Sequence, residues 1–306
     1  MKVSVGLVTF NRKEHLVRCL EGIYNQSIPV GKVYCIDNNS KDGTSELLLE
    51  YGYFEKDNFI YINTKENLGG AGGFRYAVKH ILENDDSDKI WLMDDDVMPH
   101  QKCLEGLLLQ SDKCTITQPS RRYLQDNSFV SSDSKNININ NHFQQLHSNP
   151  ICENEAKSEK IIDSESFPFE GPMFDRDMVE KIGLPDDKFF ILYDDTDYAI
   201  RAIKSGYKIK YVSDAILYRQ IKPIVVNKEV TWKTYFSIRN SIYIEKKHCS
   251  FTVFIIRTLR RFLGCLINIF NSERKYKTTK LTLLAFCDAL FGDMNNDLKR
   301  VNRILK

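Results

Sequence analysis

The 306-residue sequence lacks the patterns that define several common classes of protein. Its eight cysteines form no C-x-x-C pair and no zinc-like spacing, so we expect reduced thiols that behave as small apolar side chains. The net charge is only +2, which argues against a dedicated nucleic-acid binder. No signal peptide precedes the first apolar run, and we therefore expect a cytoplasmic protein. No basic, glycine-rich loop follows that run, which disfavours a nucleotidyltransferase.

Short apolar runs are present instead, and helical patterns separate most of them. The runs cover residues 3–9, 33–36, 59–62, 90–93 and 208–212. Helical spacing of apolar residues occurs at 16–23, 44–49 and 74–82, and again after residue 194. This alternation predicts an α/β fold with a mostly parallel, Rossmann-like sheet flanked by helices. Between about 123 and 166 the pattern dissolves, and we expect a mobile polar segment with at most a short edge hairpin.

Polar clusters stand at the ends of these runs, where parallel sheets bind their ligands. The clusters are Thr9 with Asn11, Asp37, the glycine-rich stretch 67–73 and the three aspartates 94–96. The glycine run permits close approach of a ligand to the backbone, although it does not match G-x-G-x-x-G and equally suits a tight turn without a ligand.

The stretch KIWLMDDDV ends a buried strand in three adjacent carboxylates. Such carboxylates repel one another, so a fold that presents them at a strand end usually supplies a cation. Asp94 and Asp96 alternate along an extended chain and can face one Mg²⁺ or Mn²⁺, whereas Asp95 faces the sugar or a structural partner. The alternative is a solvated acidic turn.

Five motifs in order carry a resemblance to a known family. TFNR, IDNNSKDGT, NLGGAGGF, WLMDDDV and FFILYDDTDYAIRA resemble the landmarks of inverting GT-A glycosyltransferases of family 2, from Val3 to about Asn240. NLGGAGGF with WLMDDD is most similar to the galactofuranosyltransferase branch, and the rhamnosyltransferases are the nearest alternative. The resemblance implies a GT-A catalytic domain over residues 1–228 and a helical carboxyl-terminal region over 229–306.

The same resemblance implies roles for individual residues. Asp195 aligns with the general base that deprotonates the acceptor hydroxyl, and Asp194 and Asp197 with acceptor-binding positions. The expected donor-binding residues are Thr9, Asn11, Asp37, Asn67, Gly70, Asp94, Asp95, Arg219 and Arg239. Each assignment has a structural alternative: Asp37 can close an Asx turn, the aspartates from 194 can favour a helix dipole, and Arg239 can form a packing salt bridge.

Arg219 marks a departure from the family pattern. Many relatives have a histidine after the corresponding strand that completes the metal site, but this chain reads DAILYRQ. Arginine has no lone pair to give, so we expect Arg219 to contact the donor diphosphate instead. The alternative is a shifted alignment that leaves Arg219 on the surface.

The carboxyl-terminal region is basic and helical. Residues 251–270 are mostly apolar, but Arg257, Arg260 and Arg261 share one helical face. These charges disfavour a membrane-spanning helix, and we expect a helix that lies in a membrane surface. The alternative is a helix that packs on the catalytic domain with its arginines in water.

Taken together, these features predict a glycosyltransferase at the cytoplasmic face of the cell membrane. We expect it to transfer galactofuranose from UDP-galactofuranose, with inversion and with Mn²⁺ or Mg²⁺, to a lipid-linked or oligosaccharide acceptor. The alternatives are a rhamnosyltransferase that uses dTDP-rhamnose and a catalytically silent scaffold that binds nucleotide sugars.

Overall fold

The computed structural model describes residues 1–131, 133–223, 230–272, 274–292 and 294–305. The strands are β1 Val3–Thr9, β2 Val33–Asp37, β3 Phe59–Asn63, β4 Lys89–Asp94, β5 Val97–Pro99, β6 Thr115–Tyr123, β7 Ser134–Ile137, β8 His147–Pro150, β9 Ile161–Ser164, β10 Met173–Asp175 and β11 Lys208–Arg219. The α-helices are α1 Lys13–Tyr24, α2 Thr44–Glu50, α3 Gly69–Asn84, α4 Cys103–Leu109, α5 Glu153–Ser158, α6 Arg176–Ile182, α7 Asp194–Lys204, α8 Trp232–His248, α9 Phe251–Asn271, α10 Lys275–Phe291 and α11 Leu298–Leu305. Single 3₁₀ turns occur at Tyr53–Glu55 and Asp187–Phe189.

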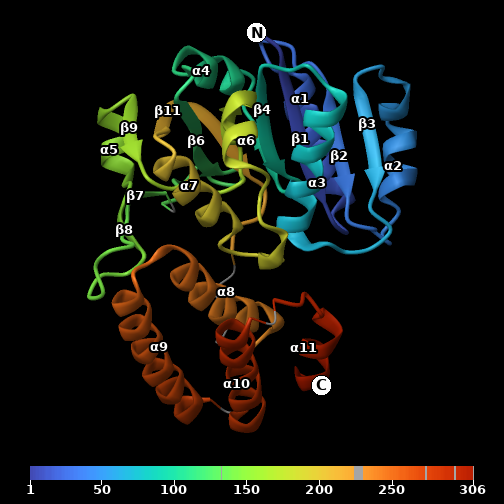
Figure 1. Cartoon of the computed structure of the whole chain (residues 1–306). Coiled ribbons are helices and arrows are strands. Elements are labelled where there is room, and N and C mark those ends of the chain that lie inside the picture. The colour runs from blue at the N-terminus through green and yellow to red at the C-terminus, as the bar shows by residue number, and fades with distance from the viewer. Residues whose placement is uncertain (132, 224–229, 273, 293, 306) are drawn as a thin grey trace.

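Within the described ranges, nine strands form one sheet in the order β3-β2-β1-β4-β10-β6-β11-β5, with β9 on β11. β1 to β4, β6 and β11 run in the same direction, and β5, β9 and β10 run against it. All five predicted strands are present, which confirms the α/β class and the mostly parallel sheet. Figure 1 shows this sheet with its helices in the upper part of the molecule and α8 to α11 below it.

The glycine-rich stretch is the first turn of α3 and not the loop that the sequence suggests. A side chain at Gly73 would collide with Val8 on β1, and one at Gly69 would collide with the Phe190 carbonyl. Gly69 also has a φ of +72°, which favours glycine. These glycines therefore bring α3 close to β1 and to the chain around residue 190. Of the four glycines in this stretch (Gly69, Gly70, Gly72 and Gly73), Gly70 alone has open space where a side chain would be.

The polar segment 123–166 has more structure than the sequence predicts. β7 and β8 form the expected hairpin, but α5 and β9 follow it, and β9 pairs antiparallel with β11 along residues 161–164. The four residues IIDS of β9 are too few to show a strand pattern in the sequence. The strand depends on its pairing with β11, which the sequence does not reveal. The mobility of the segment stays a prediction.

The carboxyl-terminal helices form a separate layer below the sheet. α8 packs against α10 and α9, and α11 packs on α8 and α10. The expected domain boundary at 228–229 lies outside the described residues. None of the helices in the described part of the chain is long and apolar enough to cross a membrane.

The arginine face of α9 lies mostly against the rest of the protein, which corrects the alternative in which the arginines lie in water; attachment to a membrane surface stays a prediction. Arg257 is 5% exposed and donates to the carbonyls of Asn138 and Asn141, and Arg261 forms a two-point ion pair with Glu245 of α8. Arg260 is exposed but donates to carbonyls of the β7–β8 connection. The arginines share one face as predicted, and each of them is bonded to the protein, although Arg260 remains exposed.

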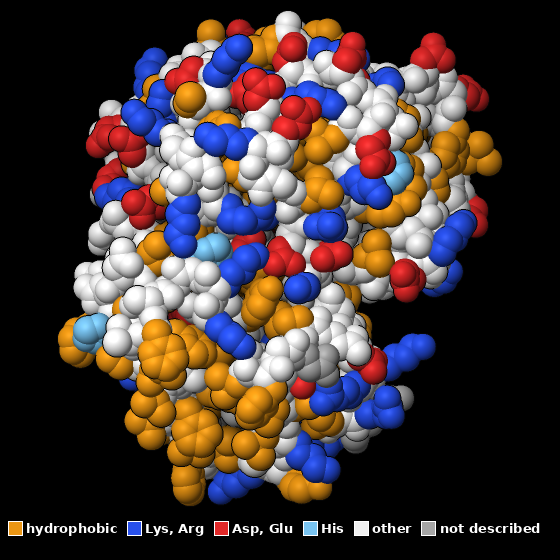
Figure 2. All heavy atoms as spheres, viewed as in Figure 1, with side chains coloured by type: hydrophobic (Ala, Val, Ile, Leu, Met, Phe, Trp, Pro, Cys, Tyr) orange, Lys and Arg blue, Asp and Glu red, His pale blue; other side chains and the backbone are white. Residues whose placement is uncertain are grey.

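The opposite face of α9 is apolar and exposed. Figure 2 shows hydrophobic side chains gathered at the lower left, over α9. Its exposed members are Phe251, Ile255, Leu259, Phe262, Leu263, Leu266, Ile267 and Phe270. We call this set the outer face of α9. It gives the helix two opposed surfaces, one polar and inward and one apolar and outward.

Candidate active site

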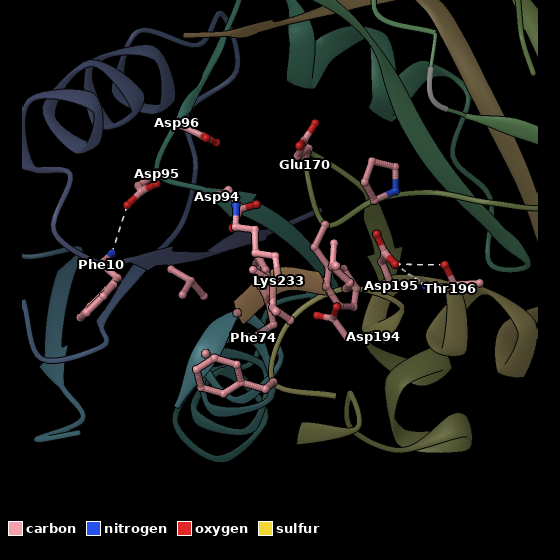
Figure 3. Close-up of a pocket in the computed structure, with 18 of the residues that line it drawn as sticks. Phe10, Phe74, Asp94, Asp95, Asp96, Glu170, Asp194, Asp195, Thr196 and Lys233 are labelled. Atoms are coloured by element: carbon pink, nitrogen blue, oxygen red, sulfur yellow. Dashed lines mark hydrogen bonds between the residues drawn. The ribbon is translucent and has the colours of Figure 1, made fainter. Parts of the chain in front are cut away.

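A cavity of about 860 Å³ opens at the carboxyl ends of β1 and β4, across from the start of α7. Figure 3 shows the aspartates of β4 on one side of it and those of α7 on the other. The sequence-predicted residues that line it are Thr9, Asn67, Gly70, Asp94, Asp95, Asp96, Asp194, Asp195 and Arg219. Thr9, Asp94 and Arg219 are far apart in the sequence, but they meet here because β1, β4 and β11 run in the same direction and end at the same edge of the sheet.

The three aspartates at the carboxyl end of β4, with Asp94 in the strand and Asp95 and Asp96 directly after it, have different partners. Asp95 is buried and accepts hydrogen bonds from the Thr9 hydroxyl at 2.8 Å and the Phe10 amide at 3.1 Å. Arg12 bridges Asp95 at 3.1 Å and Asp96 at 2.8 Å. Asp95 therefore faces structural partners, one of the two orientations that the sequence suggests.

The carboxyl group of Asp94 has no hydrogen-bond donor among the residues that the structure describes. Desolvation raises the pKa of its carboxyl well above the usual range, and the charges of Asp96 and Glu170 add to the effect. A divalent cation would remove this penalty, and carboxylate oxygens are the ligands that Mg²⁺ and Mn²⁺ prefer. Asp94 and Asp96 thus fit such an ion. Within the described ranges no group of three or more His, Cys, Asp or Glu side chains is arranged to hold a metal.

Asp194 and Asp195 begin α7 and line the other side of the cavity. Desolvation raises the pKa of Asp195 to about 6, although hydrogen bonds from the Thr196 amide at 2.6 Å and hydroxyl at 3.1 Å oppose this rise. Desolvation and the neighbouring Asp195 raise the pKa of Asp194 as well. A carboxylate with a pKa near neutrality at a helix start can accept a proton in the pH range of the cell.

The turn before α7 is strained. Phe190, Leu192 and Tyr193 have φ values of +62°, +67° and +71°, a region that such side chains rarely adopt. The Asn240 side chain donates to the carbonyls of Phe189, Ile191 and Leu192 at 2.7 to 3.0 Å. These bonds from α8 hold the turn that presents Asp194 and Asp195.

Arg239 belongs to the same support and not to a phosphate site, which corrects its expected role. Its side chain is fully buried, and its guanidinium donates to the carbonyls of Lys188 at 2.7 Å and Asn295 at 3.1 Å. It does not reach the cavity. Arg239 and Asn240, adjacent on α8, therefore both donate hydrogen bonds to main-chain carbonyls before α7.

Asp197 is also withdrawn from the site. It is fully buried and accepts from Arg201 at 2.9 Å, Lys247 at 2.8 Å and His248 at 2.7 Å. Burial opposes its ionisation, but these partners outweigh burial and lower its pKa to about 2. The acceptor-binding role expected for Asp197 is replaced by an ion cluster that joins α7 to α8.

Asn11 and Asp37 lie beside the cavity and outside its lining. Asp37 accepts from the Ser40 amide at 2.8 Å, one residue beyond the amide that an Asx turn would use, and its other oxygen accepts from the Tyr61 hydroxyl. Asn11 is exposed and accepts from the Lys41 amide at 2.7 Å. Their contact with a donor stays a prediction.

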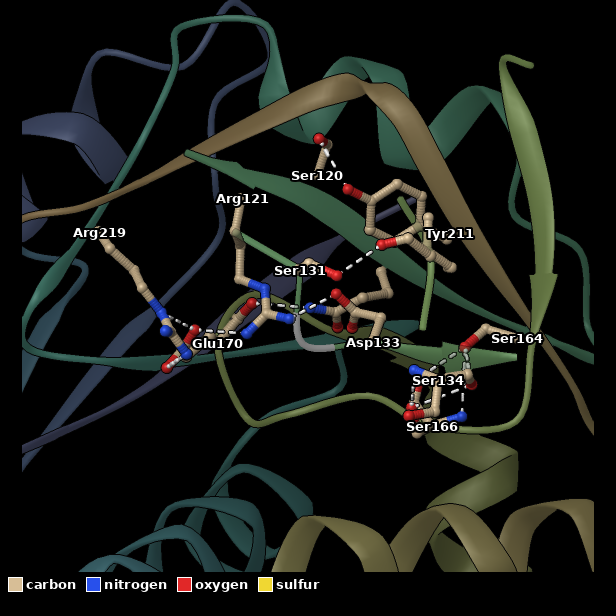
Figure 4. A network of polar contacts seen from close by, with 12 residues as sticks. Ser120, Arg121, Ser131, Asp133, Ser134, Ser164, Ser166, Glu170, Tyr211 and Arg219 are labelled. Atoms are coloured by element: carbon tan, nitrogen blue, oxygen red, sulfur yellow. Dashed lines mark hydrogen bonds and ion pairs between the residues drawn. The ribbon is translucent and has the colours of Figure 1, made fainter. Parts of the chain in front are cut away.

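Glu170 is the main residue that the sequence analysis missed. It lines the cavity and accepts from Arg219 at 2.7 and 2.8 Å and from Arg121 at 2.7 Å. Figure 4 shows the Glu170 carboxylate between these two guanidinium groups, with Asp133 on the other side of Arg121. Arg219 thus lies in the site as predicted, but it is paired with a carboxylate. A charge within the aromatic stretch FPFEGPMF was the available signal.

Further polar residues of the lining were also missed. Asn38 is buried, and its Oδ1 has no donor among the described residues. Lys233 of α8 and Arg12 bring positive charge to the lining, and His147 of β8 reaches the Thr196 hydroxyl at 3.2 Å. Only Arg12 has a sequence signal, since it directly follows the first strand motif.

The mostly parallel sheet, with carboxylates on both sides of a cavity at the carboxyl ends of its strands, has a GT-A-like architecture, and the comparison with protein families gives the family. The model of glycosyl transferase family 2 matches residues 4–183, more than half of the chain. The chain therefore belongs to glycosyl transferase family 2.

Its relatives include galactofuranosyltransferases. The chain is 23% identical over 268 residues to galactofuranosyltransferase GlfT2 of Mycobacterium tuberculosis, which covers 80% of this chain and 41% of the relative. It is 25% identical over 207 residues to galactofuranosyltransferase GlfT1 of Mycolicibacterium smegmatis, with 67% and 66% covered. The chain thus spans less than two thirds of the length of these relatives.

Solved structures share the fold. TarS residues 1–349 from S. aureus, in complex with UDP-GlcNAc, match with a TM-score of 0.59 and 15% identity over 95% of this chain and 81% of that one. Mannosyltransferase PcManGT from Pyrobaculum calidifontis, in complex with GDP-Man and Mn²⁺, matches with a TM-score of 0.55 and 16% identity over 95% and 75%. At these identities the likeness shows the fold alone.

Proposed function

We propose that this protein transfers galactofuranose from UDP-galactofuranose to a lipid-linked glycan acceptor, with inversion at the anomeric carbon. The names of the relatives GlfT1 and GlfT2 support the sugar. One observation carries the proposal: two carboxyl groups lie on opposite sides of one cavity. That of Asp94 receives no hydrogen bond from the described residues, and that of Asp195 has a raised pKa that suits proton acceptance.

Asp195 acts as the general base in this reaction. An inverting transfer needs a base that removes the acceptor proton as the hydroxyl attacks from the face opposite the leaving diphosphate. Asp195 lies across the cavity from Asp94, and its raised pKa of about 6 lets it take up that proton near neutral pH. The Thr196 amide and hydroxyl fix one carboxylate oxygen, so the other is available to the acceptor.

The diphosphate lies near the aspartates of β4. Asp94 and Asp96 would hold Mg²⁺ or Mn²⁺ there, and such an ion supplies Lewis-acid stabilisation of the leaving phosphate. Lys233 and Arg12 add positive charge from the chain itself. Arg219 contributes by neutralising Glu170, whose charge would otherwise oppose the approach of an anionic donor.

In this proposal the outer face of α9 contacts the inner surface of the cell membrane. Apolar residues on one face of a helix that cannot span the bilayer suit insertion into the interface between headgroups and acyl chains. The exposed basic residues Lys275 and Lys280, which follow on α10, favour an anionic surface. The membrane contact is thus apolar where the sequence analysis expected it to be cationic.

A donor screen tests the function directly. Purified protein is incubated with UDP-galactofuranose, other UDP-sugars, GDP-sugars and dTDP-rhamnose, and nucleotide release is measured with and without acceptor. Release from UDP-galactofuranose that depends on acceptor is expected. Preference for dTDP-rhamnose would move the protein to the rhamnosyltransferases, and binding without any release would identify a scaffold.

A further inference from the structure

A second cavity of about 440 Å³ adjoins the active site and has no role in the reaction as described so far. The β7–β8 connection at 144–147, the turn residue Tyr193, α8 and α9 form its walls. His147 lines both cavities, so the two are neighbours. Tyr193 directly precedes Asp194, and the second cavity therefore lies beside the start of α7, where the proposed general base Asp195 is.

The second cavity carries an excess of positive charge. Arg257, Arg260 and Arg261 all line it, and the acidic side chain that lines it with them is Glu245. Glu245 pairs with Arg261 at 2.7 Å and with Arg257 at 3.5 Å.

The other bonds of these arginines do not cancel their charge. Arg257 and Arg260 donate to main-chain carbonyls, which orient the guanidinium groups but carry no net charge. Moreover, Nε of Arg257 is buried without a hydrogen-bond partner. One carboxylate against three guanidinium groups leaves a site that attracts a multiply charged anion.

The same helix presents apolar side chains on its opposite side. Leu259 is 59% exposed and lies next to Arg260 in the sequence, and Leu263 is also 59% exposed. A molecule with an anionic head in the second cavity could therefore lay a hydrocarbon tail along the outer face of α9. Charge and apolar surface occur together on one helix beside the catalytic carboxylates.

We propose that the second cavity binds the phosphate or diphosphate group of a lipid-linked acceptor, and that the acceptor's hydrocarbon chain follows the outer face of α9 into the membrane. The proposal rests on the proposed sugar transfer for its biological meaning. The anion site itself is a property of the described residues and is testable without turnover.

Calorimetric titration with inorganic pyrophosphate tests the anion site. Saturating UDP occupies the donor site and EDTA removes divalent metal, so that the second cavity is the site probed. Wild-type protein is expected to bind pyrophosphate, and Arg260→Gln to bind it about tenfold more weakly, since a charge-assisted hydrogen bond is lost. Arg260 is exposed, so its replacement spares the core, and thermal unfolding confirms that the variant is folded.

Two matched variants sharpen the result. Arg260→Lys keeps the charge and should restore most of the affinity. The control variant Lys280→Gln removes an exposed positive charge outside the second cavity, so its affinity should stay within about threefold of wild type. Pyrophosphate binding that is absent in wild type, or unchanged in Arg260→Gln, would overturn the proposal.

Farnesyl diphosphate tests the path of the lipid. It should bind at least tenfold more tightly than pyrophosphate, because its chain buries apolar surface on α9. Leu259→Ser/Leu263→Ser should abolish that gain and leave pyrophosphate binding unchanged. Equal affinity of the two probes in wild type would refute the lipid path while a free anion site remained. Failure of the sugar-transfer proposal, by contrast, would appear in the donor screen and would leave these titrations as they are.

Discussion

The two aspartate clusters that line the cavity, one after β4 and one at the start of α7, have a similar arrangement but different proposed roles. Each places one member among structural partners and leaves others facing the cavity. In the β4 cluster, Asp95 is held by Thr9, Phe10 and Arg12, whereas the carboxyl group of Asp94 has no donor among the described residues. In the α7 cluster, Asp197 is held by Arg201, Lys247 and His248, whereas Asp194 and Asp195 face the cavity.

The comparison shows that hydrogen-bond and ion-pair partners, and not the charge of the side chain itself, distinguish the withdrawn carboxylates from those that face the cavity. Asp195 and Asp197 are two residues apart in one helix, yet desolvation raises the pKa of the first to about 6 while ion pairs lower that of the second to about 2. The helix dipole acts on both and therefore does not explain the difference.

The largest expected effect comes from Asp195→Asn. The substitution keeps the shape of the side chain and removes the oxygen that accepts the proton, so kcat should fall by roughly 10²–10⁴-fold. Donor affinity, measured by calorimetry, should stay close to wild type. A variant that keeps more than about a tenth of wild-type turnover would exclude Asp195 as the base.

Asp197→Asn should lower the free energy of unfolding and leave kcat nearly unchanged. It leaves Lys247, Arg201 and His248 without their shared carboxylate, and breaking a buried ion pair costs roughly 3–5 kcal/mol. Urea unfolding at pH 7 measures this loss, and kcat of the folded fraction should remain within about threefold. A stable variant with a large loss of kcat would place Asp197 in the reaction after all.

The sign of the pH effect follows from the lowered pKa of Asp197. A carboxyl that ionises more readily in the folded protein stabilises it above the unfolded pKa of about 3.9, and this contribution declines as pH falls toward 2. The stability difference between wild type and Asp197→Asn should therefore be complete above about pH 5 and narrow below about pH 4.

Asp94→Ala and Asp96→Ala test the β4 cluster. Each should weaken donor binding by about tenfold or more in Mn²⁺ and have little effect in EDTA, because the carboxylates act through the ion. Asp95→Asn is the matched control, since the partners of Asp95 are structural. It should lower the free energy of unfolding and leave the effect of Mn²⁺ on donor affinity close to that of wild type. Equal donor affinity of wild type with and without metal would remove the basis for a metal site.

The smallest expected effect is on the pH profile. Because the pKa of Asp195 is raised, the carboxyl holds a proton below about pH 6 and cannot serve as base. kcat/KM should therefore fall about tenfold per pH unit below 6 and level off above it. The residual activity of Asp195→Asn should lack this limb. A flat wild-type profile between pH 5 and 7 would contradict the assignment.

The sequence predicted the parts of the site that depend on strand order. Thr9, Asp94 and Asp195 meet in the cavity because the carboxyl ends of parallel strands share one edge of the sheet. The withdrawal of Asp197 was not predictable, because Lys247 and His248 lie about fifty residues further along the chain.

The role of Arg239 escaped prediction for a different reason. Its partners are main-chain carbonyls of a turn whose left-handed residues are Phe190, Leu192 and Tyr193, side chains that disfavour this conformation. No residue pattern announces such a turn. The prediction of a loop at the glycine run was wrong for a related reason. The contacts that require glycine there, with Val8 and Phe190, arise only when α3 packs on the sheet.

The clamped turn has a consequence for how this enzyme can be divided or recombined. Each left-handed residue at 190–193 costs roughly 1–3 kcal/mol, and the Arg239–Asn240 pair of α8 holds the turn in place. A sheet domain grafted onto the helices of another transferase would lose that restraint, and Asp194 and Asp195 would shift although neither residue had changed. Exchange of tails between family members should therefore succeed only where the arginine and asparagine travel with the turn they hold.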